Sequence, residues 1–70
     1  MAVTKALGSP APTFYTVEYR RKGSRMFYRC GYRSENLADM TEMAEREVGS
    51  GMYAAAKVID ATTCRVITSF

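Results

Sequence analysis

The sequence predicts an α+β domain with the element order ββαββ. Three observations carry this prediction: two aromatic-rich runs separated by Lys22-Gly23, a stretch of helical periodicity over residues 34–51, and two later runs of apolar and β-branched residues. With a right-handed crossover, the helix returns the third strand beside the first. The predicted sheet is therefore four-stranded and antiparallel in the order 2-1-3-4, with the helix on one face, the other face open, and strands two and four as edges.

Residues 1–12, MAVTKALGSPAP, are predicted to be a flexible N-terminal leader. Pro10 and Pro12 favour extended backbone and disfavour a helix across the residues before them. Residues 13–70 are then the single ββαββ domain. A chain of 70 residues holds no more than one domain, because a chain this short buries only about 60% of the surface that its unfolded form exposes.

The first hairpin is predicted to turn at Lys22-Gly23, since Gly tolerates the positive φ that a tight turn requires. A two-residue loop places Arg21 opposite Ser24, and it sets the register of the strands on both sides. Side chains alternate along a strand, so one face becomes largely apolar and aromatic. The pairs on that face, which is expected to be buried, are Tyr19 with Met26, Val17 with Tyr28, and Tyr15 with Cys30.

The opposite face of the hairpin is predicted to carry most of the arginines. It receives Phe14, Thr16, Glu18, Arg20, Arg25, Phe27, Arg29 and Arg33. Guanidinium groups pair bidentately with phosphate or carboxylate, and an exposed ring stacks on a base or fills a partner's pocket. The alternative without a binding function is a solvated outer face on which the aliphatic parts of the arginine side chains cover Phe27. The predicted binding surface consists of Arg20, Arg25, Phe27, Arg29 and Arg33.

The helix is expected to begin after Ser34 as the N-cap and to end at Gly49 or Gly51. Its apolar stripe, which is expected to lie on the sheet, consists of Leu37, Met40, Ala44 and Val48. Strands are predicted within residues 52–61 and 63–70, with a turn near Asp60–Thr63. Val66 and Ile67 are adjacent and must face opposite ways, so the facing of these two strands stays open.

Charge is separated along the chain more strongly than the net charge of +3 indicates. Residues 13–33 carry six basic side chains against Glu18 alone, a balance of +5, whereas residues 34–48 carry five acidic side chains against Arg46 alone, a balance of −4. Such asymmetry bears on the choice of partners and on association rates.

Catalysis is not expected from this composition. The chain has no His, so it has no Ser–His or Cys–His pair, and two distant cysteines without His do not make a zinc site. We therefore expect no catalytic residues, no metal and no cofactor. Cys30 and Cys64 are expected to be reduced, small core residues of a cytoplasmic protein, because residues 1–12 do not resemble a secretory signal. No run approaches the ~18 apolar residues of a membrane span.

The pairing of a basic hairpin with an amphipathic helix in the order ββαββ resembles small phage-encoded inhibitors of host machinery, such as RNA-polymerase inhibitors and some anti-CRISPR proteins. The resemblance covers Thr13–Arg65 and is one of architecture, with no specific motif, so no residue role carries over. It implies a non-enzymatic modulator that docks on a host protein complex handling nucleic acid, through the basic face or an edge strand.

Two alternatives belong to other function classes. The same basic face can bind nucleic acid directly, with phosphate contacts and a clear dependence on salt. Alternatively, the chain is a structural subunit that forms a homodimer through the edge strand TCRVITSF, which is apolar and β-branched.

Overall fold

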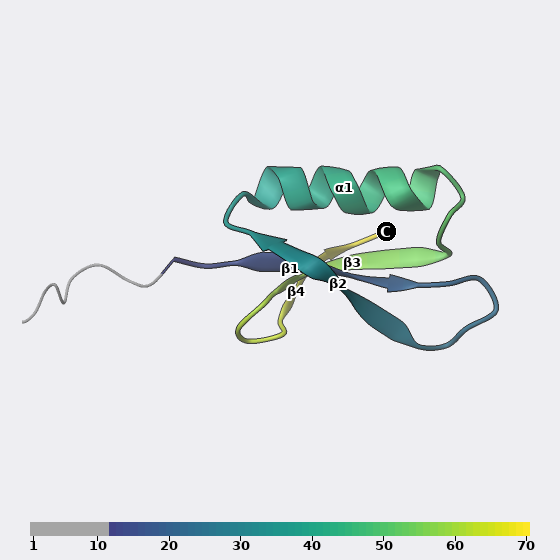
Figure 1. Cartoon of the computed structure of the whole chain (residues 1–70), viewed down its shortest axis with the longest axis horizontal. Helices are drawn as coiled ribbons and strands as arrows, with labels where there is room; N and C mark the ends of the chain where they lie inside the picture. The colour runs from purple at the N-terminus through teal and green to yellow at the C-terminus, as the bar shows by residue number, and fades with distance from the viewer. Residues whose placement is uncertain (1–11) are drawn as a thin grey trace, which may run out of the picture.

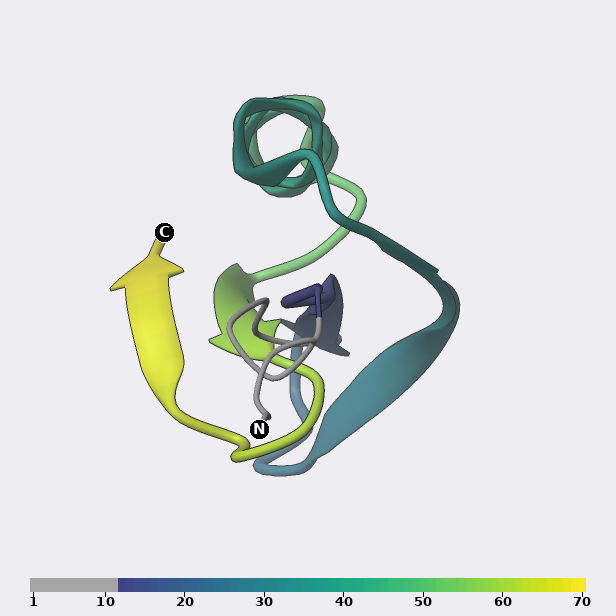
Figure 2. The same cartoon turned by 90° about the vertical axis from the view of Figure 1, so that its left-hand side faces the viewer.

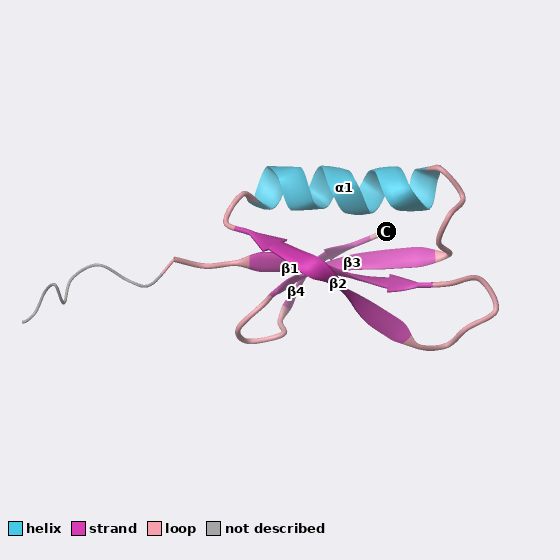
Figure 3. Ribbon diagram, viewed as in Figure 1, coloured by secondary structure: helices cyan, strands magenta, loops and turns pink. Residues whose placement is uncertain are grey.

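The computed structural model describes residues 12–70, which form one four-stranded antiparallel sheet with one helix lying along one face (Figure 1; Figure 3). The elements are β1 (Tyr15–Arg20), β2 (Phe27–Ser34), α1 (Leu37–Gly49), β3 (Ala55–Asp60) and β4 (Val66–Ser69). The strand order is β2-β1-β3-β4, which confirms the predicted fold and topology. Apart from Pro12, the predicted leader lies outside the described residues.

The helix stripe forms the core with the two central strands. Met40 and Ala44 of α1 are buried against Val17 of β1 and against Ala56 and Val58 of β3. The other stripe positions, together with one further methionine, pack at the margin of this cluster: Leu37, Met43 and Val48. Figure 2, viewed along the helix, places α1 over the centre of the sheet, with β2 and β4 at its two sides.

The start of the helix differs from the prediction. Asn36, not Ser34, is the N-cap, and its Oδ1 accepts a hydrogen bond from the Asp39 backbone N at 3.0 Å. Ser34 is still the last residue of β2, and its Oγ accepts from the Asn36 backbone N at 3.0 Å. The strand thus continues through the residue predicted to be the cap. After the helix the chain reverses at Gly51, where φ is +83°.

The hairpin turns where the sequence predicts, but the predicted register is wrong. The Ser24 backbone N donates to the Arg21 carbonyl at 3.1 Å, and Gly23 has φ +82°. Pairing then resumes with Arg20 opposite Phe27 and Tyr19 opposite Tyr28, because Arg25 and Met26 lie outside the ladder. The displacement is two residues, so the side chains that remain in the ladder keep their predicted faces.

A second irregularity lies opposite Val17. Glu18 pairs with Arg29, but Thr16 pairs with Arg33, so Val17 does not face Tyr28, and Tyr15 faces Ser34 in place of Cys30. Irregularities of this kind increase the local twist of a strand. The helix α1 packs mainly on β3 and β1 and less on the edge strand β2.

Exposure at the start of β2 differs from the prediction, because Met26 lies in the hairpin loop and Tyr28 lies on an edge strand on which α1 packs little. Tyr28 and Met26 are 56% and 61% exposed, although both were expected to be buried. Tyr15, Tyr19 and Cys30 do pack against the core, as predicted.

The sheet face away from α1 is not fully open. Val58 faces the helix, so its neighbour Ile59 faces the other way, and yet Ile59 is 1% exposed. Thr16, its cross-strand partner, is 2% exposed. Arg29 of β2 reaches Cys64 of the β3–β4 turn across this face, so the two edges of the strongly twisted sheet cover its centre. The prediction of an open face is therefore wrong at its middle.

The second turn lies where the sequence predicts, and it is organised by Asp60. The Oδ1 atom of Asp60 accepts from the backbone N of Thr62 at 2.8 Å and of Thr63 at 3.1 Å. These two hydrogen bonds hold the pKa of Asp60 below its ordinary value, and the bond from Thr63 contributes most. The turn ends at Cys64, whose φ of 64° lies in the left-handed region.

Candidate functional site

The structure places four of the five predicted binding residues on the face away from α1. Phe27 pairs with Arg20, Arg29 with Glu18, and Arg33 with Thr16, and cross-strand partners share a face. Arg25 is different, because it lies in the hairpin loop before β2 begins.

Glu18 pairs with one of these predicted cations, Arg29, and with one that was not predicted, Lys57. Its Oε2 lies 3.3 Å from Arg29 Nη2, and its Oε1 lies 3.8 Å from Lys57 Nζ. Lys57 Nζ in turn stands over the Phe27 ring, 4.2 Å from its centroid. We call Glu18, Phe27, Arg29 and Lys57 the Glu18 network. It gives Arg29 and Phe27 partners within the chain, which makes them poor candidates for a free binding surface.

Arg29 is also bound to the second turn. Its Nη2 donates to Cys64 Sγ at 3.4 Å. This hydrogen bond and the one to Glu18 raise the pKa of Arg29 above its ordinary value, so the guanidinium stays charged.

The two remaining arginines on that face have local partners too. Arg20 Nη1 donates to the Ser24 carbonyl at 2.9 Å, which braces the hairpin loop. Arg33 lies over the Phe14 ring, with its Cζ 5.1 Å from the centroid. The structure thus brings Phe27 and Arg29 together, but it leaves Arg20 and Arg33 at separate points of the face.

The hairpin loop carries the cations that lack such partners. Arg21, Lys22 and Arg25 are all exposed, and within residues 12–70 none of them lies within ion-pair distance of a carboxylate. The loop backbone is fixed by the turn at Gly23 and by Ser24, whose Oγ accepts from the Met26 backbone N at 3.1 Å. We call Arg21, Lys22 and Arg25 the basic hairpin.

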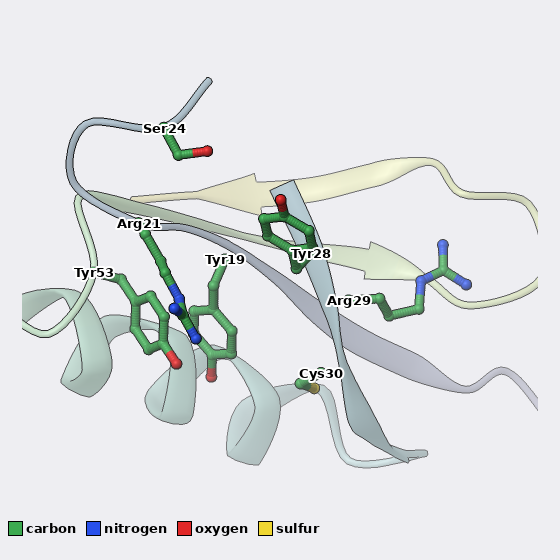
Figure 4. A pocket seen from close by; sticks show the side chains of 7 residues that line it. All are labelled: Tyr19, Arg21, Ser24, Tyr28, Arg29, Cys30 and Tyr53. Carbon is green, nitrogen blue, oxygen red and sulfur yellow. The ribbon is translucent and has the colours of Figure 1, made fainter. Parts of the chain in front are cut away.

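A cleft opens beside the basic hairpin, between the diverging hairpin strands and the connection from α1 to β3. Its volume is about 560 Å³. Figure 4 shows the side chains around it, three of which are tyrosines from β1, β2 and the α1–β3 connection. We call this the tyrosine cleft; its lining residues are Tyr19, Arg21, Ser24, Tyr28, Arg29, Cys30 and Tyr53.

Two of the tyrosines form a stacked pair. The ring centroids of Tyr19 and Tyr53 are 4.4 Å apart, and their planes are inclined by 20°. Burial first, and then the nearby Cys30 and Glu47, together raise the pKa of Tyr19 to about 12. The Tyr19 phenol is therefore neutral at physiological pH, and it presents a flat ring with a hydroxyl that donates and accepts.

The prediction from the sequence missed the tyrosine cleft and two of the three residues of the basic hairpin. It treated Arg21 and Lys22 as turn residues, although three cations within five residues at a tight turn are a readable signal of a charged tip. The role of Tyr53 could not be read from the sequence, because its contact with Tyr19 is tertiary and depends on where the α1–β3 connection packs. Lys57 was missed for a related reason: adjacent apolar residues left the facing of its strand undecided.

The two thiols differ from each other. Cys30 is half-buried and packs against the core as expected, with its Sγ 3.4 Å from Thr16 Oγ1. Cys64 is exposed on the β3–β4 turn, which corrects the prediction that it is a core residue. Its place in the left-handed position of a turn explains the difference, since that position lies at the surface.

Among the described residues, no group of three or more His, Cys, Asp or Glu is arranged to hold a metal ion. Over the same part of the chain, no helix is both long and apolar enough to cross a membrane. No family model matches the chain, and no curated protein and no solved structure shows significant similarity to it. The resemblance to phage-encoded inhibitors therefore stays a prediction.

Proposed function

We propose that this chain is a binding module that holds nucleic acid by its phosphates on the basic hairpin. The observation that carries the proposal is the set of three exposed cations at the hairpin tip, beside a cleft lined by three tyrosine rings. Exposed cations next to aromatic rings suit a strand that offers phosphates and bases together.

The division of the cations into two groups supports the hairpin over the opposite sheet face. Arg29 and Lys57 share the Glu18 carboxylate, so a phosphate that recruits either one must compete with an existing ion pair. Among the described residues, no carboxylate competes with a phosphate for the cations of the basic hairpin. A phosphate that binds them releases counterions, which is the main source of affinity for nucleic acid.

The direct test is fluorescence anisotropy with labelled oligonucleotides of random sequence, measured at about 50 mM and about 200 mM salt. The variant is Arg21→Gln/Arg25→Gln, and its matched control is Arg46→Gln/Arg65→Gln. Both double variants remove the same charge from exposed arginines, but the control positions lie on α1 and before β4.

We expect the hairpin variant to lose most of its affinity and to reduce the slope of log affinity against log salt by about 1–2, since two phosphate contacts are removed. The control should lose far less, because it changes only the long-range potential. The proposal is wrong if wild type does not bind at low salt, or if the two double variants are weakened equally.

A second candidate is docking on a protein, as the predicted modulator of a host complex that handles nucleic acid. The observation that favours it is the β4 edge, where Val66 and Ile67 are 49% and 41% exposed on a strand that, within residues 12–70, pairs only with β3. Unpaired edges accept strands from other chains.

The edge is tested with Ile67→Lys, since a lysine on an edge opposes strand addition. A pull-down from bacterial lysate should recover partners with wild type that Ile67→Lys loses; identical recovery contradicts docking at this edge. Sedimentation of the pure chain at micromolar concentration tests the predicted homodimer, for which a species of twice the 7.8 kDa mass is expected.

A further inference from the structure

We infer that the tyrosine cleft receives one unpaired base of the bound strand, so that the module prefers single-stranded to double-stranded nucleic acid. The inference rests on the proposed function and extends it, because it names the part of the nucleic acid that enters the cleft.

The rings around the cleft are arranged to stack. Tyr19 and Tyr53 form one wall as a pair that is already stacked, which fixes both rings before a ligand arrives. Tyr28, on the neighbouring strand, is 56% exposed, and Figure 4 shows it set apart from that pair. A volume of about 560 Å³ lies within the range of ordinary small-molecule sites, so the space admits a nucleobase with its sugar.

Charge gives the base an orientation. Arg21 lines the cleft and belongs to the same loop as Lys22 and Arg25, so a base in the cleft has its own phosphate within reach of the basic hairpin. On the helix side, Glu47 and Arg46 of α1 act on Tyr19 in opposite directions, Glu47 raising its pKa and Arg46 lowering it, so their charges oppose each other there. A phosphate is therefore attracted to the hairpin end of the cleft, where Arg21 lies.

A base pair inside a duplex does not offer what this cleft requires. The two faces of a paired base are covered by its neighbours in the stack, and only its edges remain accessible in the grooves. An unpaired base exposes its whole ring for stacking on an aromatic side chain, and such stacking tolerates any base. The arrangement therefore favours single strands and does not select a sequence.

The test compares Tyr28→Ala with Tyr32→Ala. Both side chains are exposed tyrosines of β2, at 56% and 60%, but only Tyr28 lines the tyrosine cleft. Because both rings are exposed, neither truncation should prevent folding, which circular dichroism checks. Affinity is measured for a single strand and for a duplex of the same sequence.

We expect Tyr28→Ala to weaken single-strand binding by about tenfold, with less than a twofold change for the duplex, and Tyr32→Ala to change neither. A strand carrying a single 2-aminopurine should change its fluorescence on saturation by wild type, and Tyr28→Ala should abolish that change. Equal weakening for both strands, no weakening at all, or unchanged 2-aminopurine fluorescence would overturn the inference.

These failures differ from a failure of the proposed function. If Arg21→Gln/Arg25→Gln still weakens binding while Tyr28→Ala affects single strand and duplex alike, the phosphate contacts stand and the base site does not. If wild type binds neither single strand nor duplex at low salt, both the function and the base site are wrong.

Discussion

Tyr19 of β1 and Tyr53 of the α1–β3 connection stack with their ring centroids 4.4 Å apart, which joins the end of β1 next to the hairpin loop to the segment that follows the helix. The Ala54 backbone N donates to the Arg20 carbonyl at 2.9 Å and reinforces the same junction. The tyrosine cleft therefore has one wall that belongs to the folded core, while Tyr28 and the basic hairpin stand outside it.

The raised pKa of Tyr19 predicts a loss of stability in strong alkali. Its pKa is about 12 in the folded chain against an ordinary value of 10.0, so the folded state holds the phenolic proton more tightly than the unfolded state does. This contribution is complete below pH 10.0 and is lost as the pH rises toward 12.

Urea unfolding across that range should show a falling midpoint in wild type and a shallower fall in Tyr19→Phe. The control is Tyr32→Phe, which removes an exposed phenol and should keep the wild-type slope. Equal slopes in all three proteins would contradict the assignment to Tyr19.

Glu18→Gln is predicted to change binding and stability in opposite directions. The substitution removes the carboxylate shared by Arg29 and Lys57, so both cations become available to bind phosphate. Affinity for nucleic acid should rise, with a steeper dependence on salt. Stability should fall by no more than about 1 kcal/mol, because partly exposed ion pairs contribute little. Anisotropy and urea unfolding of the same preparation measure both, and a loss of affinity would speak against phosphate binding near this face.

The sequence predicted the fold because its strongest local signals were independent of the tertiary structure. The turn at Gly23 requires a positive φ, and the helix stripe through Met40 and Ala44 has a period that only a helix satisfies. The register was not predictable in the same way. Arg25 and Met26 leave the ladder, and a displacement of two residues preserves the alternation from which the register was inferred.

The candidate site was less predictable, because it depends on how far the strands twist. Alternation correctly placed Phe27 and Arg29 on the face away from the helix. It does not reveal that Arg29 forms an ion pair with Glu18, or that Lys57 lies over the Phe27 ring. Nor does it reveal that Tyr28 becomes exposed, since that depends on how little of the edge strand β2 the helix covers.

Gly23→Ala is predicted to destabilise the chain through its backbone alone. A Cβ added at Gly23 meets nothing within 4 Å, so no steric clash contributes, whereas φ of +82° is unfavourable for alanine. We expect a loss of about 1 kcal/mol. Gly31→Ala is the matched control, because a Cβ there also meets nothing and its φ is not in the left-handed region. Chemical unfolding should show the control to be neutral or slightly stabilised; equal losses at both positions would contradict the conformational explanation.

Met40→Ala is predicted to leave most of the chain unfolded. Met40 is 1% exposed, and truncating a buried methionine costs about 2–5 kcal/mol. A domain of this size has about 3–5 kcal/mol of net stability, so the loss approaches its entire free energy of unfolding. Met52→Ala is the control, since that side chain is 63% exposed. Circular dichroism should show lost structure for Met40→Ala and a wild-type spectrum for Met52→Ala. A cooperative, folded Met40→Ala with a wild-type midpoint would contradict the assigned core.

Cys64 offers a test of strain at the second turn. It is a non-glycine residue at φ 64°, a conformation that costs an ordinary L-residue about 1–2 kcal/mol and costs glycine little. Cys64→Gly and Cys64→Ala both remove the thiol that Arg29 contacts, so their difference isolates the backbone. Glycine has greater entropy in the unfolded chain, which opposes the gain, so we expect Cys64→Gly to be more stable than Cys64→Ala by at most about 1 kcal/mol. If thermal unfolding ranks alanine above glycine, the strain at Cys64 is smaller than the entropy cost of glycine, which contradicts the left-handed conformation described for this turn.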